Sequence, residues 1–146
     1  MKTRFPILAA AFVFVATGVQ TACAYPLSDV SVINRTTGER LKTYRHKGQL
    51  WVAGKPGDRY AIELRNRTDE RVMTVVSVDG INVISGETAS ANQRGYVLSP
   101  GSASEIAGWR KSDQDVASFY FTALPDSYAA RTDRPADVGV IGVAVF

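Results

Sequence analysis

The stretches YAIELRN, residues 60–66, and RVMTVVSV, residues 71–78, decide the fold class of this chain. In the first, Tyr60, Ile62 and Leu64 alternate with other residues, which places three large apolar side chains on one face of a strand. The second is rich in β-branched residues, which fit a pleated sheet. A polar run, RTDE, separates the two. We therefore predict that they form an antiparallel hairpin.

Short apolar segments separated by turn residues continue along the chain. Turn signals such as Asp79-Gly80 and Ser99-Pro100-Gly101 recur about every 8–12 residues. Residues 30–33 and 41–44 are a further hairpin candidate, and residues 50–52 could add one more strand. Other strands are expected at residues 81–84, 95–98, 104–109, 116–122 and 138–146. The last is apolar on both faces, as a central strand would be. Seven to nine short strands predict an all-β domain, a small antiparallel β-sandwich or small barrel. Residues 125–136 could add one helical turn.

The sequence Asn-Arg-Thr occurs twice, at residues 34–36 and 66–68. Each copy falls at a predicted turn, and asparagine side chains commonly bind the backbone two residues further on. We interpret the repeat as the same turn chemistry used twice. Both copies also match the acceptor pattern for N-glycosylation.

The N-terminus has the three parts of a secretory signal. Lys2 and Arg4 are positively charged, residues 5–19 are almost entirely apolar, and Ala22-Cys23-Ala24 is a small-x-small cleavage site. A transmembrane helix needs roughly 20 apolar residues, more than this segment has. The sequence predicts a signal peptide over residues 1–24 and a single domain over residues 25–146, exported to the periplasm or secreted.

Cleavage after Ala24 changes the chemistry of the mature chain. Cys23 is the one cysteine, so the mature chain would have neither disulfides nor thiolate sites. The alternative is lipid attachment at Cys23, for which Gln20 is a poor match. The whole chain has 17 Lys and Arg against 14 Asp and Glu, and loss of Lys2 and Arg4 leaves 15 against 14. A net charge of +1 gives no reason to expect a specific nucleic-acid partner.

Several segments resemble a group of exported bacterial β-rich proteins of unknown function. The resemblance covers roughly the last 88 residues and is carried by VSVDGINVISG (76–86), GYVL (95–98), IAGWRKS (106–112), SYAAR (127–131) and VGVIGVAVF (138–146). It implies a shared domain and carries no activity for any residue.

Metal and cofactor sites are not expected. His46 is the one histidine, so zinc or copper would lack ligands. Asp113 and Asp115 could contribute to a calcium site, but the residues of a calcium-binding loop are missing around them and a solvated turn is the simpler interpretation.

A hydrolase would need a nucleophile with a base, or two facing carboxylates. No serine lies in Gly-x-Ser-x-Gly, and spacing selects no pair among the candidate carboxylates, which are Asp79, Glu87, Glu105, Asp113 and Asp126.

The densest positive charge is the segment RLKTYRHK, residues 40–47. Arg40, Lys42, Arg45 and Lys47 could bind lipopolysaccharide, a glycan or nucleic acid phosphates. Alternatively, they protect the edge of a hairpin from pairing with other strands.

The triplet Trp109-Arg110-Lys111 is the other candidate ligand site. A tryptophan beside two cations at the end of a strand could stack on a sugar ring or anchor a protein contact. It could instead close the end of the sandwich as a core residue. Tyr128, Arg131 and Arg134, in the irregular segment, could line the same end of the domain.

These observations favour an exported, non-catalytic binding or structural module of the bacterial cell envelope. Its partner would be an unidentified protein or glycan, and the mature chain would have neither a cofactor nor a transmembrane segment. The alternatives are a secreted hydrolase and a surface protein that binds polyanions or glycans through residues 40–47.

Overall fold

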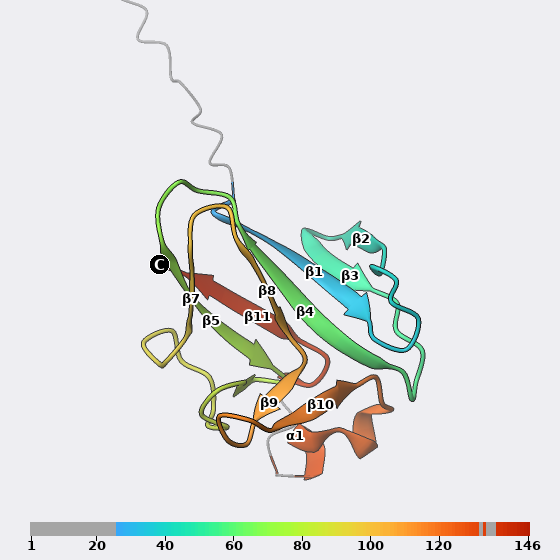
Figure 1. The fold of residues 1–146 in the computed structure, drawn as a ribbon. Helices are drawn as coiled ribbons and strands as arrows, with labels where there is room; N and C mark the ends of the chain where they lie inside the picture. The colour runs from blue at the N-terminus through green and yellow to red at the C-terminus, as the bar shows by residue number, and fades with distance from the viewer. Residues whose placement is uncertain (1–25, 132, 134–136) are drawn as a thin grey trace, which may run out of the picture.

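The computed structural model describes residues 26–131, 133 and 137–146. Two antiparallel sheets pack face to face, and a two-stranded ribbon projects from one side (Figure 1). The sheets remain open rather than closing into a barrel. The predicted all-β, sandwich-like fold is therefore confirmed. The predicted signal peptide, with Cys23 and Tyr25, lies outside the described residues.

The first sheet has five strands. They are β1 (Ser28–Asn34), β4 (Arg59–Asn66), β10 (Val116–Tyr120), β9 (Gly108–Arg110) and β8 (Ala103–Ile106). The strand order is β1-β4-β10-β9, and β8 also pairs with β4. β1 pairs with the full length of β4, from Ser28↔Asn66 to Asn34↔Tyr60.

The second sheet has four strands around β5. They are β11 (Ile141–Val145), β5 (Val72–Val78), β6 (Ile81–Asn82) and β7 (Tyr96–Leu98). The turn between β5 and β6 is at Asp79 and Gly80, both with positive φ, as a tight two-residue hairpin requires.

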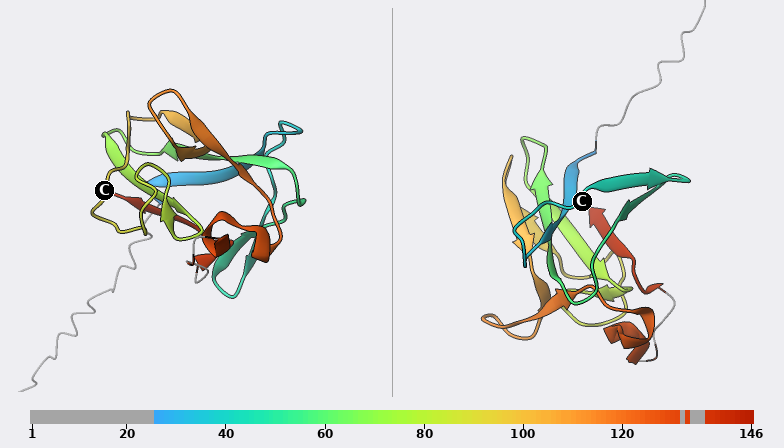
Figure 2. Two further views of the ribbon diagram at one scale, coloured as in Figure 1. Left: turned by 90° about the horizontal axis from the view of Figure 1, so that it is seen from below. Right: turned by 90° about the vertical axis from the view of Figure 1, so that its right-hand side faces the viewer.

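The inner faces of the two sheets form one core. The first sheet contributes Tyr60, Ile62, Leu64 and Phe119, and the second contributes residues such as Val76 and Val78. The alternation predicted for β4 is confirmed, and Phe119 is fully buried while its neighbour Tyr120 is half exposed. Figure 2 shows the two layers from below and from the side.

The hairpin predicted from residues 60–66 and 71–78 is wrong. β4 pairs with β1, β8 and β10, whereas β5 pairs with β6, β7 and β11. The connection between β4 and β5 passes from one sheet to the other instead of forming a tight hairpin turn. The Asn66 side chain holds this connection. Its Nδ2 donates to the carbonyls of Glu70 (2.6 Å) and Ser99 (3.1 Å), and Thr68 N donates to its Oδ1 (2.9 Å).

Asn34 makes the same kind of turn as Asn66. Its Oδ1 accepts hydrogen bonds from the backbone N–H groups of Thr36 (2.8 Å) and Thr37 (3.1 Å). The two Asn-Arg-Thr sequences therefore form the same type of turn, in which the asparagine side chain accepts a hydrogen bond from the backbone two residues further on. Both asparagines are buried, which makes them unsuitable glycan acceptors in the folded domain.

Three strand predictions need correction. β11 is an edge strand rather than a central one, since it pairs only with β5. Residues 104–109 form two strands, and the chain steps from β4 to β10 at Ala107. Gly108 allows this step, because a Cβ there would lie 2.1 Å from the Ala117 carbonyl oxygen.

The third correction concerns the basic segment. Strand β2 (Thr43–His46) pairs with β3 (Gln49–Val52) rather than with residues 30–33. The segment before it touches β1 through the bridge between Ile33 and Arg40, through nearby backbone hydrogen bonds and through the hydrogen bond from Arg40 to Ser31.

The expected helical turn is present as η1 (Leu124–Asp126) and α1 (Tyr128–Arg131). Residues 132 and 134–136, which also belong to that prediction, lie outside the described residues. Within the described ranges, these short helices are too short to cross a membrane.

Candidate functional site

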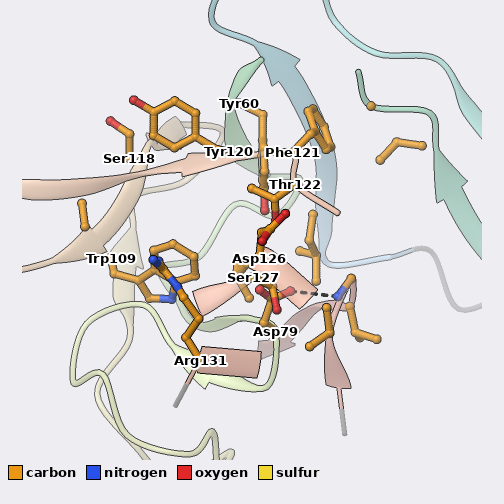
Figure 3. A pocket seen from close by; sticks show the side chains of 18 of the residues that line it. Tyr60, Asp79, Trp109, Ser118, Tyr120, Phe121, Thr122, Asp126, Ser127 and Arg131 are labelled. Atoms are coloured by element: carbon orange, nitrogen blue, oxygen red, sulfur yellow. Dashed lines mark hydrogen bonds between the residues drawn. The ribbon is translucent and has the colours of Figure 1, made fainter. Parts of the chain in front are cut away.

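A pocket of about 700 Å³ opens at the end of the sandwich formed by β9, β10 and α1 (Figure 3). Residues far apart in sequence line it, from the start of β4, the end of β5, the ribbon and the segment after β10. Five aromatic side chains belong to its wall: Trp51, Tyr60, Trp109, Tyr120 and Phe121. A volume of this size fits a small organic ligand rather than a few waters.

The aromatic wall is fixed by ring contacts. Tyr60 stacks between Phe119 and Phe121, with centroid separations of 5.3 Å and 4.4 Å. Trp109 meets Phe119 edge to face at 4.7 Å and 83°. Rings held in this way lose little freedom when a ligand binds. Trp51, on the ribbon, is 54% exposed and forms the outer part of the wall.

The Tyr60 hydroxyl opens onto the pocket from a largely buried ring. Tyr60 is only 7% exposed, and within the described part of the chain its hydroxyl forms no hydrogen bond. Figure 3 shows this hydroxyl pointing into the pocket toward Asp79 and Asp126. A buried tyrosine hydroxyl normally has a partner. This one is available to a ligand.

Burial, and secondarily the negative charge of Asp79, raise the pKa of Tyr60 above its ordinary value of 10.0. Both effects disfavour the phenolate. The phenol therefore keeps its proton at all physiological pH values and can donate a hydrogen bond.

Two carboxylates face the same region. Asp79, at the β5–β6 turn, accepts a hydrogen bond at Oδ1 from the backbone N–H of Gly139 (2.8 Å), and Asp126 lies at the end of η1. Among the residues that the structure describes, neither carboxylate forms an ion pair. Both keep acceptor capacity for a ligand.

Three cations lie on the pocket wall. Arg110, Lys111 and Arg131 are all exposed, and Figure 3 shows Arg131 extending toward Trp109. Arg110 also lies over the Tyr96 ring, 5.9 Å from its centroid. None of the three is in an ion pair with a described carboxylate.

The structure brings together the triplet of Trp109, Arg110 and Lys111 with Arg131, one of the three residues of the irregular segment considered for this end. Another of the three, Arg134, lies outside the described residues. Trp109 packs against the core and also lines the pocket, while its role in binding stays a prediction. Sequence reasoning missed Tyr60 and left Asp79 and Asp126 unselected among other carboxylates. The one available signal was a tyrosine at an inward-facing strand position, where its hydroxyl needs a partner.

The basic segment does not act as one cluster. The Arg40 guanidinium binds Glu63 at 2.6 Å and also Ser31, which ties it to the first sheet. Lys42 lies over the Tyr44 ring at 5.3 Å. Arg45 and Lys47 are exposed on β2 and at the ribbon turn.

Over the described ranges, the structure has no group of three acidic, histidine or cysteine side chains placed to hold a metal ion. His46 pairs with Gln49 on the ribbon and is not a lining residue of the pocket.

Comparison of the chain with models of known protein families, with curated proteins and with solved structures gave no match.

Proposed function

We propose that this chain is an exported, non-catalytic binding module of the bacterial cell envelope, whose ligand occupies the pocket beside Trp109. The observation that carries the proposal is the composition of the pocket. Its aromatic wall, buried phenol, two carboxylates and three cations come from separate parts of the chain. Convergence of a few polar groups on a largely apolar concave site is typical of small-molecule sites.

A binding role fits this site better than hydrolysis by a serine nucleophile. Ser118 and Ser127 are lining residues, but the chain's one histidine lies on the ribbon and could not activate either of them. The Ser127 hydroxyl instead accepts a hydrogen bond from Ala130 N at 3.1 Å, at the start of α1. The remaining hydrolytic alternative uses Asp79 and Asp126, and an assay for product tests it directly.

Tryptophan fluorescence tests the site, because the chain has two tryptophans and both line the pocket. Trp51→Phe leaves Trp109 as the single emitter, and Trp109→Phe leaves Trp51. We expect one ligand of a small-molecule panel to shift both emissions with the same saturation curve and to protect both from acrylamide.

Saturable binding that shifts neither tryptophan emission would show that the ligand binds outside this pocket, and it would contradict the proposal. Turnover of the bound compound, lost in Asp79→Asn and Asp126→Asn, would instead establish the hydrolase.

A further inference from the structure

We propose that the ligand of this pocket is a saccharide that carries an acidic group. The inference rests on the binding role proposed above and names the chemistry that the lining residues select.

Tyr60 and Asp79 together favour a ligand group that both accepts and donates hydrogen bonds. The Tyr60 phenol, protonated and without a partner, needs an acceptor. The Asp79 carboxylate, which holds one backbone N–H, needs a further donor. The two side chains are not hydrogen-bonded to one another. A hydroxyl accepts and donates at the same time, whereas an ammonium only donates and a carboxylate only accepts.

Asp126 adds a second carboxylate beside the first (Figure 3). A ligand with several neighbouring hydroxyls can serve Tyr60, Asp79 and Asp126 together. A fatty acyl chain would supply no hydrogen-bond donor to either carboxylate. A simple phosphate or carboxylate ion would be repelled by them, because like charges at short range are unfavourable.

The rings complete the recognition of a sugar. Saccharide rings have C–H faces that pack on aromatic rings while the hydroxyls at their edges form hydrogen bonds. Trp109 and Trp51 supply such faces at the inner and outer parts of the wall. The volume of about 700 Å³ leaves room for a monosaccharide or disaccharide.

The acidic group follows from the distribution of charge. Asp79 is partly buried, whereas Arg110, Lys111 and Arg131 are exposed at the pocket's wall. A hydroxyl-bearing ring placed against Tyr60 and Asp79 would direct an anionic substituent toward these cations. Either a carboxylate or a phosphate would serve, since each accepts charge-assisted hydrogen bonds.

Calorimetric titration of the mature chain tests the ligand class with glucose, glucuronic acid and glucose 6-phosphate. Choline and L-tyrosine serve as compounds outside the class. We expect both acidic sugars to bind about tenfold tighter than glucose, since a charge-assisted hydrogen bond is worth about that factor. The comparison of glucuronic acid with glucose 6-phosphate shows which acidic group the cations prefer.

Two pairs of variants separate the parts of the site. Tyr60→Phe, which keeps the stacked ring, and Asp79→Asn, which can still accept from Gly139, should each weaken all three sugars about tenfold or more. Arg131→Gln and Lys111→Gln should remove the preference for acidic sugars and leave glucose unchanged. The matched control is Tyr44→Phe, the same change on the exposed ribbon, outside the pocket, and it should alter nothing.

The two proposals fail in different ways. Binding of choline or L-tyrosine in a Tyr60-dependent manner, with no sugar binding, would overturn the saccharide and keep the binding role. Sugar affinities that change less than twofold in Tyr60→Phe and Asp79→Asn would also overturn the proposed recognition. If none of the five compounds binds, the saccharide proposal falls, and if the wider panel also leaves both tryptophans unchanged, so does the binding role.

Discussion

Replacement of Asn66 by alanine should be among the most damaging single changes in the domain. Asn66 is only 1% exposed. Its amide nitrogen donates to the carbonyls of Glu70 and Ser99 at 2.6 Å and 3.1 Å, and its oxygen accepts from the amide and hydroxyl of Thr68 at 2.9 Å and 2.8 Å. Each hydrogen bond contributes about 1 kcal/mol net, so we expect a loss of about 3–4 kcal/mol. Domains of this size are stable by about 5–15 kcal/mol.

Urea denaturation, followed by circular dichroism, measures this loss in the mature chain. The matched control is Asn92→Ala, since Asn92 is exposed and accepts one hydrogen bond, from the Ser90 hydroxyl. The control should change the free energy of unfolding by less than about 0.5 kcal/mol. If the two variants differ by less than 1 kcal/mol, the argument that Asn66 holds the crossing between sheets is wrong.

Asn66→Asp adds a dependence on pH. A carboxylate at this position would be desolvated and would face backbone carbonyl oxygens, which raises its pKa above the ordinary value of about 4. When the pKa of an acid is higher in the folded state, the folded state loses stability as pH rises above the pKa of that acid in the unfolded chain. We therefore expect the variant to lose stability, relative to wild type, between about pH 4 and pH 7. If the difference in free energy of unfolding between the variant and wild type is the same at pH 4 and at pH 7, this prediction is wrong.

Three further predictions follow from burial, charge and the precursor segment. Phe119→Ala should cost about 3–5 kcal/mol because the ring is fully buried, whereas Val97→Ala, at a position 65% exposed, should cost less than about 0.5 kcal/mol in the same denaturation assay. Tyr60 has a raised pKa in the folded state, so wild type should lose stability as pH rises above 10.0, and Tyr60→Phe should reduce that slope in thermal melts. Intact-mass analysis of the exported protein should give a chain that begins at Tyr25, and a mass that includes an acylated Cys23 would refute the predicted cleavage.

The sequence by itself determined the secondary structure class and many strand positions. Alternation in residues 60–66, the β-branched run at 71–78 and the turn at Asp79-Gly80 are local signals, set by side-chain period and by backbone preference. The repeated Asn-Arg-Thr turns were also readable, because a side chain that bonds its own backbone two residues on needs no distant partner.

Only the tertiary structure decided which strands pair and where the site lies. Hydrophobic alternation says which face of a strand is buried and leaves open which neighbour it joins. β4 and β5 could therefore be adjacent in sequence and lie in opposite sheets, and β11 could be apolar throughout and still form an edge. The triplet at Trp109 was visible locally. Its meeting with Tyr60, Asp79 and Asp126 depends on long-range packing that brings four distant segments to one end of the sandwich.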